Sequence, residues 1–203
     1  MEAMIAPASA SDSRPDSRSS ADSSTRNAPE IARWEIAPQT LCIRILRESD
    51  TPLLEWHGGT DLRDWYQKQW RAHETGEITV LVADFNDFPI GQAAIHWHGK
   101  PTHPQIPDIQ SLRVFGAFQG MGIGTKLIHA CESAVRHRVE HEGEDHTRIS
   151  ISVSVENPRA KALYERLGFV VVGDTYEDKW HYVDARGQTI YQSEIVYDLV
   201  KAI

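Results

Sequence analysis

Three glycines at every second position constrain this chain more than any other feature of its sequence. They lie in QGMGIGTKL, residues 119–127, between the alternating run DIQSLRVF and an apolar pattern with helical spacing. A glycine-rich turn that opens a helix exposes backbone N–H groups at the positive end of the helix dipole, and this arrangement binds phosphate. The stretch therefore predicts either a phosphate-bearing ligand or a turn that packs closely against a sheet.

Two common phosphate motifs do not fit the spacing of these glycines. A dinucleotide fingerprint needs Gly-x-Gly-x-x-Gly, but a count from Gly120 places Thr125 at the third glycine. A count from Gly122 places Leu127 there. A Walker A loop needs a glycine directly before its lysine, whereas Thr125 precedes Lys126. A phosphate ligand at this turn would therefore be held in another way.

Hydrophobic periodicity over the rest of the chain predicts a mixed α/β domain without an internal repeat. The expected strands are 41–49, 78–85, 89–98, 108–115, 148–156, 170–183 and 189–200. The expected helices are 51–59, 60–77, 123–142 and 157–169. The order is thus a strand, helices, three strands, a helix, a strand, a helix and two strands, which predicts a sheet flanked by helices.

The N-terminal segment differs in composition from the rest. It is rich in Ser, Asp, Arg and Pro and nearly empty of large apolar side chains, so it buries too little surface to offset the entropy lost on ordering. We expect residues 1–30 to be a disordered tail and residues 31–203 to form a single domain. The tail lacks the apolar stretch of a secretory signal, and Asp12, Asp16 and Asp22 argue against a transit peptide.

Charge and cysteine usage limit the classes of partner. The formal net charge of -8 disfavours a nucleic-acid partner bound through a broad basic face. No run approaches the roughly 18 apolar residues that span a bilayer, so we expect no membrane partner. Cys42 and Cys131 form no CxxC pair and no metal-ligand spacing, which favours reduced thiols and a cytoplasmic location.

A second motif lies downstream of the glycine turn, in VENPRAKALYERLGF, residues 155–169. It fits N-x-x-A-x-x-L-Y-x-x-x-G-F, and QGMGIG fits Q/R-x-x-G-x-G/A. With a strand and a helix between them, the two motifs resemble the two signatures of the GNAT superfamily of N-acetyltransferases. The residues that match the second signature are Asn157, Ala160, Leu163, Tyr164, Gly168 and Phe169. The resemblance covers residues 78–199 and is sharpest over residues 108–169.

The resemblance implies a GNAT fold: a mixed, mostly antiparallel sheet of about seven strands, flanked by helices and splayed between the fourth and fifth strands. It implies acetyl transfer from acetyl-CoA to a primary amine of a small molecule or a protein. The loop would bind the pyrophosphate, and the pantetheine arm would pair with strand backbone like a missing strand. The implied cofactor-binding residues are Leu112, Val114, Gln119, Gly120, Met121, Gly122, Ile123, Gly124, Thr125, Asn157 and Tyr164.

The resemblance also implies catalytic roles. Tyr164 matches the tyrosine that donates a proton or a hydrogen bond to the leaving thiolate, and a phenol with a pKa near 10 keeps its proton at neutral pH. The alternative for Tyr164 is an aromatic residue that packs on the sheet, and the alternative for Asn157 is a helix N-cap. Asp108 stands at the start of the strand before the loop, where related enzymes place a glutamate as the general base, and the alternative for Asp108 is a loop residue after Pro107.

The histidines of HWHGKPTH offer a rival base. In a strand His96 and His98 would share one face, and histidine accepts a proton near neutral pH. Together with His103 they hint at zinc, but no matching Asp, Glu or Cys ligand is evident, so we expect no metal. Solvated or pocket-lining histidines are the third option.

Two other functions fit the same motifs. One is a CoA-binding regulatory module that has lost catalysis, which the intact Tyr164 disfavours. The other is a toxin that acetylates aminoacyl-tRNA, which the net charge of -8 disfavours. No motif identifies the acceptor amine. Trp65, Trp70 and Trp180 lie in the segments that would shape its pocket, and they either face the acceptor or, as is commoner for such residues, pack in the core. A homodimer is one expected assembly.

Overall fold

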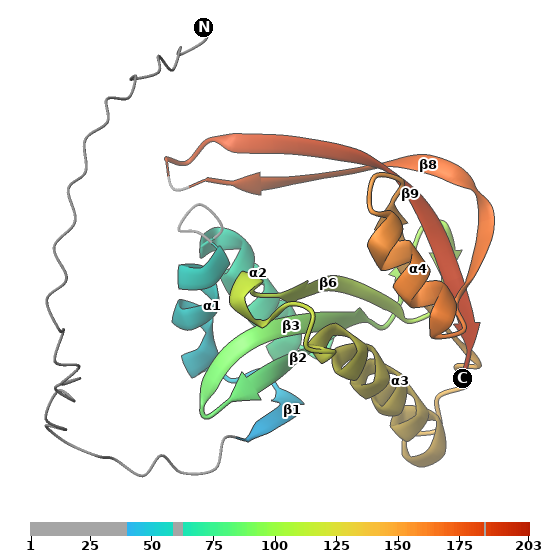
Figure 1. The fold of residues 1–203 in the computed structure, drawn as a ribbon, viewed down its shortest axis with the longest axis horizontal. Coiled ribbons are helices and arrows are strands. Elements are labelled where there is room, and N and C mark those ends of the chain that lie inside the picture. Colours follow the sequence, from blue (N-terminus) through green and yellow to red (C-terminus); the bar gives the residue numbers. More distant parts are fainter. Residues whose placement is uncertain (1–39, 59–62, 185) are drawn as a thin grey trace, which may run out of the picture. The chain divides into compact units, whose positions relative to one another are not determined.

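The computed structural model describes residues 40–58, 63–184 and 186–203 (Figure 1). The expected disordered tail at 1–30 and the start of the expected domain, 31–39, lie outside these residues. The main sheet contains seven strands in the order β1-β2-β3-β6-β7-β9-β8, and β4 pairs with β5 in a separate two-stranded sheet. No described helix combines the length and the hydropathy that crossing a bilayer requires.

The predicted order of elements is confirmed. The strands of the main sheet are β1 (Leu41–Ile45), β2 (Ile78–Phe85), β3 (Phe88–His96), β6 (Asp108–Val114), β7 (Arg148–Ser154), β8 (Val170–Val183) and β9 (Thr189–Ala202). The helices are α1 (Thr51–Gly58), α2 (Arg63–Glu74), α3 (Ile123–His141) and α4 (Pro158–Arg166). The small sheet of β4 (Gly99–Lys100) and β5 (His103–Pro104) is an addition, because this stretch has no alternating pattern.

The third strand is shorter than predicted. β3 ends at His96, and the chain turns through His98. Gly99 follows with a φ of +68°, and a Cβ there would lie 2.3 Å from the carbonyl oxygen of His103, so the turn requires glycine. The expectation that His96 and His98 share a strand face is therefore wrong, because His98 lies in the turn.

Helices cover both faces of β3. Gln92 Nε2 donates to Gln69 Oε1 of α2 at 3.4 Å. Trp97, directly after the strand and on its other face, lies under the guanidinium of Arg138 in α3, 3.7 Å from the ring centroid. Every residue of β3 between its two ends is buried, so this strand runs through the centre of the core.

The sheet opens between β6 and β7, its fourth and fifth strands. These strands are parallel, and they pair only at Asp108 with Ser150 and at Ile109 with Ile151. Ser111 has a φ of +54°, and β6 is bulged against β3 at this point, which bends β6. The predicted splay between the fourth and fifth strands is confirmed.

Helix N-termini flank this opening. The carboxyl end of β6 leads through a short 3-10 helix, Gly116–Phe118, and the glycine loop into α3. The carboxyl end of β7 leads through Asn157 into α4. In α/β sheets, ligands bind beyond the carboxyl ends of parallel strands, so the topology predicts a ligand site here.

β8 and β9 form a long hairpin that extends past the other strands toward α2 (Figure 1). Each strand has 14 residues. β9 pairs with β7 only from Val196 to Ala202, so no strand in the described part of the chain lies beside the other half of the hairpin. The projecting half consists of residues 176–183 and 189–194. It contributes side chains to the cavity at the opening between β6 and β7, and most of its residues are exposed.

Candidate active site

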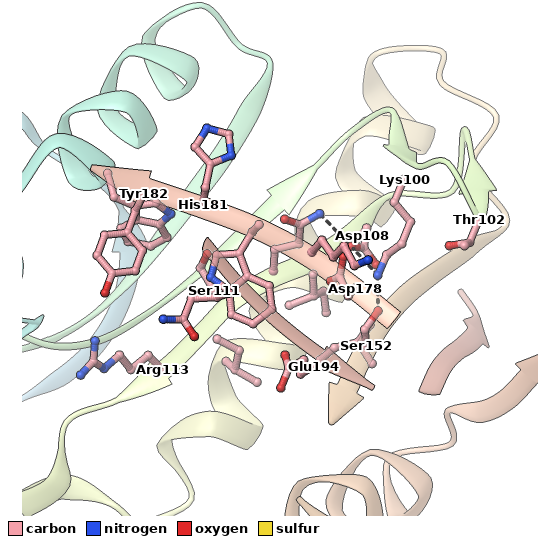
Figure 2. A pocket seen from close by; sticks show the side chains of 18 of the residues that line it. Lys100, Thr102, Asp108, Ser111, Arg113, Ser152, Asp178, His181, Tyr182 and Glu194 are labelled. Carbon is pink, nitrogen blue, oxygen red and sulfur yellow. Dashed lines mark hydrogen bonds and ion pairs between the residues drawn. The ribbon is translucent and has the colours of Figure 1, made fainter. Parts of the chain in front are cut away.

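A cavity of about 1130 Å³ lies at the opening between β6 and β7 (Figure 2). The sheet and its loops contribute Gln92, Lys100, Pro101, Thr102, Asp108, Ile109, Gln110, Ser111, Leu112, Arg113, Ile151 and Ser152. The helices contribute Trp65, Tyr66 and Tyr164, and the hairpin contributes Tyr176, Asp178, Lys179, Trp180, His181, Tyr182, Gln192 and Glu194. Side chains far apart in the sequence therefore meet at the splay.

The structure brings some of the predicted site residues together in this cavity and leaves others outside it. Tyr164, Asp108 and Leu112 line the cavity. His96 and His98 are not among its lining residues, and neither is Trp70. The loop at 119–125 lies outside the cavity too, at the start of the helix that follows β6.

The glycine loop presents N–H groups that have no partner among the described residues. Gly120 and Gly122 have φ values of +79° and +76°, a conformation that favours glycine. Within the described residues, the N–H groups of Gly120, Met121 and Gly122 donate to no acceptor. The first-turn N–H groups of α3 likewise have no intrahelical partner. The Gln119 side chain donates to the carbonyl oxygen of Val114 at 2.9 Å and ties the loop to β6.

Gly124 is the glycine that the fold itself does not require. Its φ lies outside the left-handed region, and an added Cβ would meet only Val114 Cγ2, at 4.0 Å. At Gly120 and Gly122 an added Cβ would meet nothing within 4 Å. Close packing on the sheet therefore does not explain these glycines. The open space beside the loop fits a ligand that approaches the backbone.

α4 places Tyr164 at the cavity. Asn157 Oδ1 accepts the N–H of Ala160 at 3.0 Å, so Asn157 is the N-cap of this helix. Tyr164 is 7% exposed, and its ring packs against Phe169 with the centroids 6.3 Å apart. Burial raises the pKa of Tyr164 to about 12, so the phenol keeps its proton throughout the physiological pH range.

Asp108 begins β6 and is fully buried. Ser150 Oγ donates to its Oδ1 at 2.7 Å, and Gln110 Nε2 donates to its Oδ2 at 3.0 Å. Lys100 Nζ lies 3.6 Å from the same Oδ2. The carboxylate is therefore held in a fixed orientation at the paired end of the opening.

A second carboxylate, Asp198, shares Lys100 with Asp108 and was not singled out by its sequence context. Lys100 Nζ lies 3.2 Å from Asp198 Oδ1. Ser152 Oγ and Thr102 Oγ1 donate to Asp198 at 2.6 and 2.8 Å. Burial raises the pKa of Asp198, but the hydrogen bonds from Ser152 and Thr102 together with the charge and hydrogen bond of Lys100 outweigh it, so the pKa is lowered. Burial lowers the pKa of Lys100, but the two carboxylates outweigh it and raise this pKa.

The two candidate histidines differ in environment. His96 is the register partner of Asp108 on the neighbouring strand. Burial lowers the pKa of His96, and the charge of Asp108 only partly offsets this effect, so the ring is neutral at pH 7. His98 is exposed. In the described part of the chain, no three His, Cys, Asp or Glu side chains are grouped as a metal site would need.

A sheet opened between two parallel strands, with a loop of free N–H groups on one side and a protonated tyrosine inside, is the architecture of an acetyltransferase. The chain belongs to the Acetyltransferase (GNAT) family, whose family model matches residues 42–169. The family and the fold predicted from the sequence are confirmed, and the chain is an acetyltransferase enzyme.

Similar proteins agree with this assignment. The chain is 27% identical over 155 residues to the aminoglycoside N(6')-acetyltransferase type 1 of Klebsiella pneumoniae, covering 64% of this chain and 74% of that protein. It shares the fold of aminoglycoside acetyltransferase AAC(6')-Ib in complex with coenzyme A, with a TM-score of 0.55, 22% identity and coverage of 80% and 95%. Arabidopsis thaliana NAA60 in complex with acetyl-CoA has a TM-score of 0.55 at 18% identity, with coverage of 81% and 99%.

Proposed function

We propose that this enzyme transfers the acetyl group of acetyl-CoA to a primary amine of a small molecule or protein by direct attack of the amine. The supporting observation is the opening between β6 and β7, which has the glycine loop beside it and Tyr164 within it. Two solved proteins with the same fold hold coenzyme A or acetyl-CoA. Acetyl-CoA supplies the thioester carbonyl that the amine attacks.

The glycine loop fits the pyrophosphate of CoA. Its free N–H groups and the first turn of α3, residues 119–125, supply several donors, and the helix start adds about half a positive charge. Beyond Ile109, β6 pairs with no described strand on its β7 side, so its backbone near Leu112 and Val114 offers hydrogen bonds to the amides of the pantetheine arm. Asn157, at the end of β7, is the proposed contact from the other side of the opening.

Tyr164 is the proposed proton donor to the leaving sulfur. The reaction forms a C–N bond and breaks a C–S bond, while the amine loses a proton and the sulfur gains one. A thiol has a pKa near 8.5, well below the value of about 12 for Tyr164. Complete transfer of the phenol proton to the released thiolate is therefore uphill, and the phenol instead donates a hydrogen bond that strengthens as charge develops on sulfur, which takes its proton from solvent.

Asp108 is the proposed general base. An amine with a pKa near 10.4 is almost entirely protonated at pH 7, and its deprotonation costs roughly 4 to 5 kcal/mol. Asp108 lines the cavity, and its orientation is fixed by Ser150 and Gln110. His96, neutral and in register with Asp108, is the rival.

Release of free thiol from acetyl-CoA in the presence of a panel of primary amines and an aminoacyl-tRNA tests the function. Thiol release with a small or protein amine supports it. Acetyl-CoA that raises the melting temperature without thiol release from any acceptor would identify a CoA-binding module instead. Thiol release with aminoacyl-tRNA alone would identify the toxin activity.

The Asp108→Asn variant should lower kcat/KM for the amine on the order of 10²-fold while acetyl-CoA affinity holds, because asparagine keeps the size but accepts no proton. Activity should recover as pH rises toward the pKa of the amine, where the neutral amine needs no base. A pH–rate profile of the variant and the parent measures this.

His96→Gln and His98→Gln, measured over the same pH range, are the matched rivals. If the pH–rate profile of His96→Gln lacks the fall in rate at low pH and the profile of Asp108→Asn equals that of the parent, His96 is the base. His98→Gln should behave like the parent, because His98 is exposed and does not line the cavity.

A further inference from the structure

Two carboxylates face each other on the cavity side of the β8–β9 hairpin. Asp178 of β8 and Glu194 of β9 are direct register partners, and both line the cavity. Side chains opposite each other in an antiparallel pair lie on the same face, and like charges in this position destabilise the pair. This arrangement therefore opposes folding of the hairpin and needs another explanation.

The acid on the other face of the same hairpin is paired, in contrast. Glu177 Oε2 lies 2.8 Å from Lys179 Nζ, and this pairing together with Ser193 lowers the pKa of Glu177. Among the described residues, no cation forms an ion pair with Asp178 or Glu194. The hairpin neutralises its outward acid and leaves the two cavity-facing acids uncompensated.

The cations that line the cavity are engaged or directed elsewhere. Lys100 pairs with Asp108 and Asp198, and Lys179 pairs with Glu177. Figure 2 shows Arg113 and His181 extending away from the two hairpin carboxylates. A cation bound between these carboxylates must therefore come from a ligand.

Two further observations point to an amine-bearing ligand. Gln92 lines the cavity and is 2% exposed, and its Oε1 has no hydrogen-bond donor within the described residues. A buried carbonyl oxygen without a donor is costly, so a rotation of the Gln92 side chain that brings Oε1 to a ligand N–H is favoured. Trp180 lies two residues from Asp178 on the same hairpin face and is 42% exposed, which offers an aromatic face to an ammonium group.

We infer that the acceptor carries a second ammonium group, which binds between Asp178 and Glu194 while the reacting amine lies at Tyr164 and Asp108. This inference rests on the proposed function and names its substrate class: a small amine with two or more positive charges. Gln92 Oε1 accepts an N–H of the same ligand, and Trp180 packs beside the distal ammonium.

A matched pair of probes tests the substrate class, namely 1,6-diaminohexane and hexylamine. They have the same carbon chain and differ in the second charge. For the parent enzyme, kcat/KM per amine group should be roughly tenfold higher for 1,6-diaminohexane than for hexylamine. This advantage should shrink at high ionic strength, because salt screens the interaction of partly exposed charges.

The Asp178→Asn/Glu194→Gln variant should remove the diamine advantage through a higher KM for the diamine, whereas the KM of hexylamine should rise far less. Glu177→Gln, on the opposite face of the hairpin, is the matched control and should keep the advantage. The melting temperature of the double variant should equal or exceed that of the parent, because the like-charge repulsion is gone. Equal kcat/KM for the two probes in the parent would overturn the inference.

Calorimetric titration with 1,6-diaminohexane separates this inference from the proposed function. If neither amine is acetylated, the proposed function fails, and the titration still decides whether the two carboxylates form a cation site. Affinity that falls roughly tenfold in the double variant, and holds in Glu177→Gln, supports the site. Equal affinities in parent and double variant contradict it.

Discussion

Replacing Gly124 with valine should lower acetyl-CoA affinity on the order of 10²-fold or more while the protein remains folded. The added side chain would occupy the open space beside the loop, where its Cβ meets no protein atom closer than 4.0 Å. Gly122→Val is a poorer test, because the φ of +76° at Gly122 makes any side chain strained. The shift in melting temperature on adding acetyl-CoA measures the effect.

Gly116→Val is the matched control for this substitution. Gly116 precedes the same loop, its φ lies outside the left-handed region, and an added Cβ there also meets nothing within 4 Å. It should keep the acetyl-CoA affinity of the parent. Unchanged acetyl-CoA affinity in a well-folded Gly124→Val protein would show that the glycine loop does not bind the pyrophosphate.

The second large effect is expected for Tyr164→Phe, which should lower kcat on the order of 10²-fold without weakening acetyl-CoA binding. The substitution removes the proton donor and keeps the ring that packs against Phe169. Because the pKa of Tyr164 is about 12, deprotonation of this residue should not limit the parent rate below that pH. Single-turnover kinetics with a saturating amine measure the chemical step.

Equal turnover in Tyr164→Phe and the parent would reduce Tyr164 to a packing residue. A melting temperature close to that of the parent is the control, since the only loss is a phenolic oxygen at the cavity wall. A lower kcat together with a higher KM for acetyl-CoA would indicate a binding role in place of proton donation.

Local signals predicted the parts of the fold that depend on neighbours in the sequence. The two motifs identified the loop before α3 and the capped start of α4, and the parallel pairing between them follows from a strand–helix–strand order. Strand-like runs of apolar and β-branched residues predicted all seven strands of the main sheet, including β3, whose interior is buried on both faces. Positive φ at Gly120 and Gly122 is also a local property.

The remaining parts of the site depend on contacts that no local pattern encodes. Lys100 and Asp198 are far apart in the sequence, and they meet only because the small β4–β5 sheet lies against β9. The bulge at Ser111 breaks the regular pairing of an otherwise alternating strand. The opposition of Asp178 and Glu194 depends on a register shift between Val172 and Tyr176, which the alternation does not reveal.

The projecting half of the β8–β9 hairpin also has a consequence for how such an enzyme changes over evolutionary time. Its side chains are mostly exposed and pair with no third strand, whereas β3 and the paired ends of β6 and β7 lie in the core. Substitutions on the hairpin therefore disturb the stability of the domain little. A few substitutions on the hairpin, each with little effect on stability, can therefore create a preference for a new acceptor while β3, β6 and β7 keep their sequence.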